Sequence, residues 1–181
     1  MNDQELVSDY LRGDEKAFPE LVKRYIQPIH NFVFSSVRDA GQAEDITQEV
    51  FIKAWTHLRR FDLTKSFKVW LYAIAKNCIF DYLRKKKIVP FSALEQEDQV
   101  FEIPAREPGP DEILRQTDSW KTLDNAMGKL PFDSREVLIL YYRDGFNFRE
   151  IAEIFKTSVN TIKSRHLRAM AQLRKILHPN R

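Results

Sequence analysis

The sequence contains little of what marks several common protein classes. Cys78 is the only cysteine, so no disulfide bond can form within the chain. All apolar runs are too short to span a membrane, and the N-terminal residues MNDQELVSDY do not form a signal peptide. We therefore expect a cytoplasmic protein with no membrane insertion and no internal disulfide.

The residue patterns of common enzyme sites are also absent. No metal-ligand spacing relates the four histidines, which are His30, His57, His166 and His178. The sequence has no glycine-rich phosphate loop, nucleophile elbow or paired catalytic carboxylates. Cys78 is at helical spacing from Ile74 and Tyr82, which indicates a buried packing residue rather than a reactive thiol. We expect no enzymatic activity, no metal and no cofactor.

The residues that are abundant indicate a helical, globular protein. Hydrophobic residues make up 43% and charged residues 30% of the 181 residues, which is typical of a soluble folded chain. With only five glycines, and with apolar residues at helical spacing nearly throughout, the chain is predicted to be all-α. The net charge of +3 is small, and its uneven distribution is more informative than its total.

The segment from Phe146 to Leu177 predicts two helices joined by a tight turn. Asn147 is a suitable N-cap for the first helix, and Glu150 follows three residues later as the partner of a capping box. Thr157 or Ser158 can cap the second helix. This arrangement is typical of a helix-turn-helix, whose second helix enters the major groove of DNA.

The second of these helices has two different sides. Helical spacing predicts a buried side made of Ile162, Ala169, Met170, Leu173, Ile176 and Leu177. The opposite side holds Asn160, Lys163, Ser164, Leu167, Arg168 and Ala171. From Lys156 to Arg181 there are seven Lys or Arg and no Asp or Glu. A solvated helix face normally mixes both signs, so we favour DNA binding over an ordinary exposed face on a helical bundle.

Four helices are predicted before residue 90, and the third is acidic at its start. They cover about residues 3–12, a segment that opens at Asp14, residues 42–60 and residues 67–87. No basic residue interrupts the acidic group Asp39, Glu44, Asp45 and Glu49. Composition alone favours a simple explanation, because carboxylates near a helix N-terminus stabilise the helix dipole. The alternative is a docking surface for a basic partner.

The loop FDLTKS, residues 61–66, and the helix after it interleave aromatic and basic residues. The predicted core side holds Phe67, Trp70, Leu71, Ile74, Cys78 and Tyr82, and around it lie Lys65, Lys68, Lys76, Asn77 and the basic run 84–87. Rings stack on unpaired bases and cations follow phosphates, so this composition suits single-stranded nucleic acid. Phe61 is the best candidate for an exposed ring, because it stands in the loop.

The helical pattern is lost between Phe91 and Arg115. This segment has three prolines, one glycine and seven acidic residues against two arginines, which predicts a flexible acidic linker. The linker, residues 91–115, separates two predicted domains of four helices each, residues 1–90 and 116–181.

The second domain begins with a helix that ends before Pro131. Asp133 or Ser134 is a suitable N-cap for the next helix, and Gly145 ends it. Together with the helix-turn-helix, these two helices complete a four-helix domain.

Four stretches of the sequence follow the patterns of one known family. They are AEDITQEVFIKAW (43–55), SFKVWLYAIAKNCIFDYLRKKK (66–87), LPFDSREVLILYYRDGFNFREIAEIF (130–155) and VNTIKSRHLRAMAQLR (159–174). In this order and at these separations they resemble a bacterial RNA polymerase sigma factor of the extracytoplasmic-function (ECF, group IV) family, over essentially the whole chain. The resemblance implies sigma region 2 in residues 1–90 and sigma region 4 in residues 116–181. It also implies a protein that binds core RNA polymerase, directs it to promoters and helps to open the duplex.

The resemblance further implies roles for individual residues. The clamp helices of the largest polymerase subunit would be bound by Asp45, Gln48 and Glu49, and the flap of the second-largest subunit is a further expected contact. Melting and capture of the −10 element would involve Phe61, Lys65, Ser66, Trp70, Lys76, Asn77 and Arg84, with core packing an equal expectation for Trp70. The −35 element would be contacted by Lys163, Ser164, Leu167 and Arg168, and nearby phosphates by Asn160, Thr161 and Arg165.

Some points stay open at the level of the sequence. The family often has Gly-Thr-Val where this chain has Asn160, Thr161 and Ile162, so the −35 preference is undetermined. The family also implies an anti-sigma factor that holds the protein inactive. A stand-alone helix-turn-helix regulator is an alternative, but it leaves the acidic helix and residues 61–87 without a role. A helical adaptor that binds only proteins does not explain the basic C-terminal end.

Overall fold

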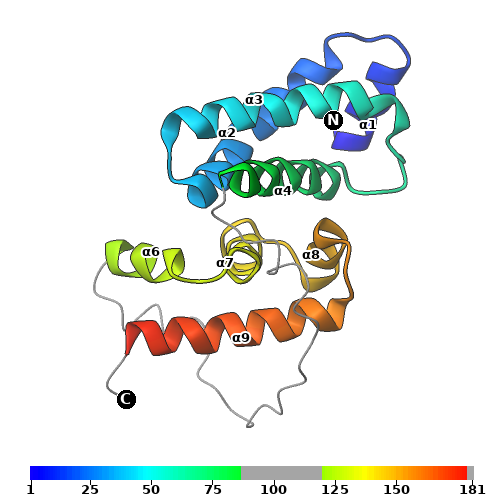
Figure 1. The fold of residues 1–181 in the computed structure, drawn as a ribbon. Helices are drawn as coiled ribbons and strands as arrows, with labels where there is room; N and C mark the ends of the chain where they lie inside the picture. The colour runs from blue at the N-terminus through cyan, green and yellow to red at the C-terminus, as the bar shows by residue number, and fades with distance from the viewer. Residues whose placement is uncertain (87–119, 179–181) are drawn as a thin grey trace. The chain divides into compact units, whose positions relative to one another are not determined.

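The computed structural model describes residues 1–86 and 120–178, and all regular structure in these ranges is helical (Figure 1). The chain divides into two compact units, with α1 to α4 in the first and α6, α7 and α9 in the second. The prediction of an all-α chain with two small helical domains is therefore confirmed. The predicted linker, residues 91–115, lies outside the described residues. Within those residues, no helix is long and apolar enough to cross a membrane.

The first unit has one short helix followed by three longer ones. They are α1 (Asp3–Leu11), α2 (Ala17–Val37), α3 (Ala40–His57) and α4 (Phe67–Lys85), with a 3-10 turn, η1 (Leu58–Arg60), after α3. The side chains of Asn2, Asp39 and Ser66 cap α1, α3 and α4 by accepting a backbone N–H of the first turn. Short polar side chains thus set the start of these three helices.

The core of the first unit is built around α2, which packs against both α3 and α4. Leu21, Ile29 and Phe32 are fully buried on α2 at helical spacing. The ring of Phe32 lies 5.2 Å from the ring of Tyr72 on α4. Burying a side chain of this size contributes about 1.5–3 kcal/mol, so these contacts hold the helices in place. Cys78 is buried as predicted.

Four α-helices lie in residues 120–178, the second range that the structure describes. They are α6 (Trp120–Gly128), α7 (Phe132–Leu138), α8 (Phe148–Phe155) and α9 (Val159–Leu177). α7 continues directly into a π-helical turn, η3 (Ile139–Arg143), which closes where the Asp144 amide donates to the Ile139 carbonyl at 3.1 Å. Gly145 follows in the left-handed region, with φ +72°, and ends the helix as predicted.

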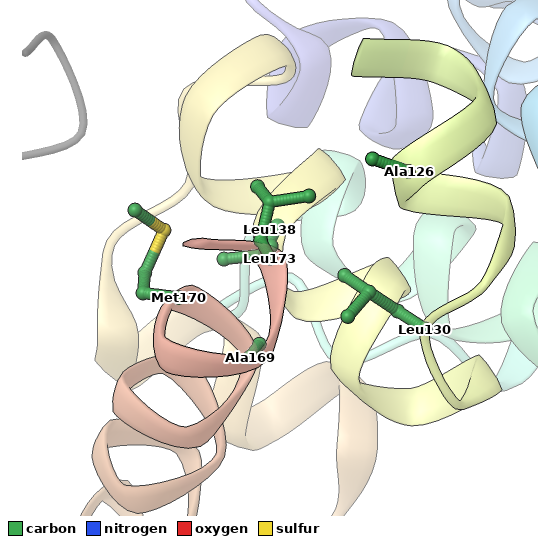
Figure 2. Packing of buried hydrophobic residues seen from close by; sticks show 6 residues of the cluster. All are labelled: Ala126, Leu130, Leu138, Ala169, Met170 and Leu173. Carbon is green, nitrogen blue, oxygen red and sulfur yellow. The ribbon is translucent and has the colours of Figure 1, made fainter. Parts of the chain in front are cut away.

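A cluster of apolar side chains from several helices holds the second unit together. Figure 2 shows its buried members, which are Ala126, Leu130, Leu138, Ala169, Met170 and Leu173. Further apolar residues pack against it, namely Leu123, Met127, Ile176 and Leu177. α9 contributes to this cluster through one side only, so its opposite side is left for solvent.

The start of α7 differs from the prediction. Its N-cap is Pro131, with no side-chain hydrogen bond, rather than Asp133 or Ser134. The fixed φ of proline, −53° here, suits the start of a helix without a polar cap. Asp133 instead forms an ion pair with Arg165 of α9, with 3.0 Å between Oδ2 and Nη1. Asp133 therefore pairs with Arg165, which is distant in the sequence, and does not cap the helix as the local pattern predicted.

Candidate nucleic-acid and polymerase interfaces

Local hydrogen bonds cap both helices of the helix-turn-helix at their N-termini. Asn147 Oδ1 accepts the Glu150 amide at 3.1 Å, and Glu150 Oε2 accepts the Asn147 amide at 2.9 Å, so the predicted capping box is confirmed. Ser158 Oγ accepts the Thr161 amide at 3.0 Å and caps α9. Lys156, at φ +53°, turns the chain between the two helices. These contacts fix where α9 begins and hence which of its sides is exposed.

α9 has the two sides that its sequence predicts. The buried residues of this helix are Ile162, Ala169, Met170 and Leu173. On the opposite side, the exposed residues are Asn160, Lys163, Ser164 and Ala171, and the half-buried ones are Leu167 and Arg168. The Arg168 Nε donates to the Ser164 carbonyl at 3.3 Å. No acidic residue follows Lys156 in the sequence, so carboxylates of the same helix do not neutralise this side.

Two residues predicted to lie near −35 phosphates make contacts within the protein. Arg165 is paired with Asp133 of α7, and both side chains are partly buried. Thr161 Oγ1 lies 2.8 Å from Ser158 Oγ at the cap of α9. Both residues therefore help to hold the helix in its place.

A cluster of aromatic rings fixes another flank of α9. The Tyr142 hydroxyl lies 2.8 Å from His166 Nε2, and Tyr141 stacks on Phe148 with 4.6 Å between ring centroids. Burial lowers the pKa of His166, so the neutral imidazole is favoured. The π-helical turn η3 carries both tyrosines. Helical spacing in the sequence could not indicate this cluster, because a π turn shifts the register of the residues that follow.

The acidic start of α3 serves two purposes. Asp39 Oδ1 accepts the Gln42 amide at 3.0 Å, so this carboxylate caps the helix. Asp45, Gln48 and Glu49 lie on the solvent side of α3 and are exposed. The simple explanation from helix capping therefore holds for Asp39, while the other three residues form an exposed polar surface.

Two large apolar side chains extend this exposed side of α3. Ile52 is 61% exposed and Trp55 is 56% exposed. Helical spacing places Ile52 within one turn of Gln48 and Glu49. The Trp55 Nε1 donates to the Tyr10 hydroxyl at 2.6 Å, which ties the ring to α1. Adjacent exposed apolar side chains of this size are typical of protein–protein contact surfaces, and the sequence analysis missed them.

The prediction that Phe61 is an exposed ring is wrong. Phe61 is only 7% exposed, and its ring centroid lies 5.9 Å from Phe67 and 5.1 Å from Trp70. The Phe61 amide donates to the Leu58 carbonyl at 3.0 Å, so the residue still belongs to the turn that ends at η1. A position outside a helix does not decide where a side chain points when neighbouring rings offer it apolar surface.

The exposed part of this loop is ordered by its own hydrogen bonds. Asp62 Oδ1 accepts the Thr64 hydroxyl at 2.7 Å and the Thr64 amide at 3.0 Å, which hold the pKa of Asp62 below its usual value. The Lys65 amide donates to the Asp62 carbonyl at 2.9 Å. Ser66 Oγ accepts the Val69 amide at 3.4 Å as the N-cap of α4. Lys65 is therefore presented to solvent from a defined turn.

The predicted −10 residues on α4 do not all share one side. Trp70, Asn77 and Arg84 are seven residues apart and so lie along the same side of the helix. Trp70 is half-buried, whereas Asn77 and Arg84 are exposed, and Arg84 lies 3.3 Å from Asp81. Lys76 is displaced from Asn77 by about 100° around the helix. The structure brings the first three residues together and places Lys76 apart from them.

Comparison with known proteins identifies both units. The family model for sigma-70 region 2 matches residues 21–88, and that for sigma-70 region 4 matches residues 120–173. The ECF RNA polymerase sigma factor SigW of Bacillus subtilis is 34% identical over 173 residues, which cover 92% of this chain and 91% of SigW. The chain belongs to the ECF RNA polymerase sigma factors.

Two solved structures resemble this ECF sigma factor. CnrH, in complex with the cytosolic domain of CnrY, has a TM-score of 0.72 and 26% identity, and the match covers 99% of both chains. The sigma factor RpoE of Bartonella quintana, in complex with the anti-sigma factor NepR, has a TM-score of 0.68 and 26% identity. That match covers 92% of this chain and 99% of RpoE.

The general role of the two units follows from membership of this family. The ECF sigma factor directs transcription initiation through regions 2 and 4, and it is not an enzyme. The match to region 2 spans most of α2 and all of α3 and α4, and α1 precedes it. The match to region 4 runs from α6 into α9. In the part of the chain that the structure describes, no group of three or more His, Cys, Asp or Glu could hold a metal ion.

Proposed function

We propose that this ECF sigma factor recognises promoters with three separate surfaces. The exposed side of α3 binds the clamp helices of the largest subunit of core RNA polymerase. α9 reads the −35 element, and the loop of residues 62–66 with the outer side of α4 captures melted −10 bases. One observation carries the proposal: each surface has exposed residues on an element whose other side packs in a core, and they are Asp45, Gln48 and Glu49; Asn160, Lys163 and Ser164; and Lys65, Asn77 and Arg84.

Region 4 supplies contacts to duplex DNA. Lys163 and Arg168 are suited to guanine edges, Ser164 to several bases and Leu167 to a thymine methyl group. Asn160 and Thr161 stand at the N-terminus of α9, where backbone N–H groups favour a phosphate. Arg165 is paired with Asp133, so it helps to orient α9, and its guanidinium lies where it can contact the DNA backbone. Region 4 also binds the flap of the second-largest polymerase subunit, a partner that we infer from family membership.

Region 2 supplies contacts to the melted strand. Lys65, Ser66 and Asn77 contact an extruded base and the strand beside it, and Arg84 and Lys76 contact phosphates. Trp70 keeps part of its ring exposed for the edge of the melted segment, and Phe61 supports that ring from the core side. Unstacking costs a few kcal/mol per base step, and stacking with pocket hydrogen bonds returns a similar amount, so capture can favour the open state.

The exposed side of α3 supplies the polymerase contact. Asp45, Gln48 and Glu49 form its polar part, and the two carboxylates are complementary to a basic partner surface. Ile52 and Trp55 add an apolar part next to them. An apolar centre beside polar groups is the usual make-up of a specific protein interface.

An anti-sigma factor is the proposed regulatory partner. The complex of RpoE with the anti-sigma factor NepR supports this, because RpoE is similar to this chain over 92% of its length. We place the sigma factor in the cytoplasm, where its polymerase partner works.

Reconstitution with core RNA polymerase tests the proposed function. The holoenzyme is expected to select templates from a random promoter library whose start sites share one −35 and one −10 sequence. Matched libraries incubated with core polymerase alone provide the control. A chain that binds duplex DNA unaided and confers no promoter-specific initiation would instead be a stand-alone helix-turn-helix regulator.

A further inference from the structure

α1 packs at one end of the first unit, and the loop between η1 and α4 lies at the same end (Figure 1). Leu6 and Val7 are 2% and 0% exposed, so this helix contributes to the core. Asn2 and Glu5 form a capping box at its start, with two bonds of 2.8 Å. Although α1 precedes the residues matched to region 2, it is a packed part of the same unit.

Two neighbouring residues in the first turn of α1 make side-chain contacts outside this helix, one with the loop and one with α2. The Gln4 Nε2 donates to the Lys65 carbonyl at 3.4 Å. Asp3 accepts a hydrogen bond from the Tyr25 hydroxyl through Oδ2 and pairs with Arg24 through Oδ1. Tyr25 is 8% exposed, so its bond to Asp3 is largely shielded from water. One contact is made with the loop backbone itself, and the other with α2 beside it.

The ring of Tyr25 extends the second contact to the base of the loop. It lies 5.6 Å from the ring of Phe67, the first residue of α4. Phe67 is 1% exposed, and its ring lies 5.9 Å from Phe61 and 5.7 Å from Trp70. Aromatic pairs at these separations attract one another and pack without voids. The loop is therefore bounded by rings at its base, and Gln4 holds its backbone at Lys65.

We propose that α1 positions the loop of residues 62–66 for capture of a −10 base, with Gln4 and Asp3 as positioning residues. They act through Lys65 and Tyr25 and not on DNA. The inference rests on the proposed function of the loop. A base pocket on an exposed loop needs its groups held within a fraction of an ångström, and the hydrogen bonds inside the loop fix its shape but not its place on the domain.

The test uses holoenzyme reconstituted from the full chain and core RNA polymerase. The probe is a labelled single-stranded oligonucleotide with the −10 sequence found by promoter selection, compared with one whose −10 bases are shuffled. Gln4→Met keeps the size of the side chain but cannot donate to the Lys65 carbonyl. Tyr25→Phe keeps the ring but loses the bond to Asp3. Asp9→Asn is the matched control, since Asp9 also lies on α1 and pairs with exposed Arg12.

Both test variants are expected to lower the preference for the −10 oligonucleotide about two- to tenfold, the range for loss of one hydrogen bond. Affinity for core polymerase and binding to −35 duplex stay unchanged in both variants, the thermal midpoint stays unchanged in Gln4→Met, and Asp9→Asn matches the unsubstituted protein. Equal preference in Gln4→Met and the unsubstituted holoenzyme overturns the role of α1 while leaving that of the loop. A parallel loss of thermal stability and core affinity in Gln4→Met also overturns it, because α1 would then be only structural. If the unsubstituted holoenzyme shows no −10 preference, the proposed function of the loop fails as well.

Discussion

The two DNA-facing surfaces of this sigma factor are built in different ways. α9 presents Lys163 and Arg168 from a regular helix, and the whole segment after Lys156 contains no carboxylate. The loop of residues 62–66 has a single cation, Lys65, and lies beside the packed rings of Phe61, Phe67 and Trp70. Duplex DNA has regularly spaced phosphates and a groove that accepts a helix, whereas a melted strand has no fixed shape. A reader of the melted strand must therefore be held rigid by the rest of its domain.

This comparison shows which contacts hold α9 and the loop of residues 62–66 in place. α9 begins at a local cap, Ser158, and contacts with α7 and η3 hold it in place through the pairs Asp133–Arg165 and Tyr142–His166. The loop has short-range bonds of its own, such as those of Asp62 with Thr64, and it accepts a bond at the Lys65 carbonyl from Gln4 of α1, which is 61 residues away in the sequence. Substitutions on α1 and in the ring cluster should thus disturb −10 capture, while −35 binding should respond to substitutions on α9 and to loss of its contacts with Asp133 and Tyr142.

The largest expected effect is a loss of stability of the first unit when one ring of its aromatic cluster is removed. Phe67 is 1% exposed and packs against Tyr25, Phe61 and Trp70. Phe67→Ala is expected to destabilise the first unit by about 3–5 kcal/mol, because a buried ring is replaced by a cavity. Chemical denaturation of the purified chain measures the change.

The matched control for this substitution is Leu138→Ala in the core of the second unit. It is expected to destabilise that unit by about 2–5 kcal/mol and to leave the transition of the first unit unchanged. A loss below about 1 kcal/mol for Phe67→Ala would show that the rings do not carry the first unit.

A smaller effect is expected on α9, the helix that we propose binds −35 duplex. Arg168→Ala is expected to weaken binding of the holoenzyme to −35 duplex by about 1–3 kcal/mol, since one charge-assisted contact is lost. Fluorescence anisotropy with a labelled −35 duplex gives the affinity. Arg12→Ala is the control, because Arg12 is an exposed arginine of the first unit. Equal affinities of the two variants would remove Arg168 from the DNA contact.

Salt dependence distinguishes the two surfaces more finely. Arg165→Ala is expected to reduce the slope of log affinity against log salt for −35 duplex by about 0.9, the value for one phosphate on duplex DNA. Lys65→Ala is expected to reduce the slope for single-stranded −10 DNA by about 0.7. Titrations at several salt concentrations measure both slopes. A steeper slope for the −10 strand than for the −35 duplex would contradict the division between a charged helix and a rigid loop.

The smallest expected effect is a pH dependence confined to the second unit. Burial holds the pKa of His166 below its usual 6.5, so the unfolded chain binds a proton more readily than the folded one. This contribution to stability is present above pH 6.5 and is lost as pH falls through the lowered value. Thermal denaturation between neutral and mildly acidic pH should show the loss, and His166→Gln should reduce it. His57→Gln in the first unit is the control, and an unchanged pH profile in His166→Gln would refute the assignment.

Much of the fold could be predicted because its signals are local. The capping box of Asn147 and Glu150, the cap at Ser158 and the buried spacing from Ile162 to Leu173 all depend on residues a few positions apart. The same locality made the exposed side of α9 predictable. The residue roles assigned to this side, to the loop and to α3 remain predictions that the experiments above address.

The features that could not be predicted depend on contacts that reach beyond the next turn of a helix. Asp133 pairs with Arg165 instead of capping α7, and Phe61 turns toward Phe67 and Trp70 instead of toward solvent. The π-helical turn carries Tyr142, which contacts His166, and a π turn departs from the regular helical spacing used to read the sequence. For Asp133, an ion pair with another helix takes the place of a capping bond, whose usual contribution is about 1 kcal/mol.

The central claim is that α9 supplies binding to the promoter while the loop and α4 supply melting. The most direct test places a fluorescent base analogue in the −10 element, where its emission rises on unstacking, and adds saturating holoenzyme. The account predicts a full rise for Arg168→Ala once it is saturating, and little rise at any concentration for a variant with both Lys65→Ala and Asn77→Ala. Full opening by that double variant, or a bound Arg168→Ala holoenzyme that fails to open the promoter, would contradict it.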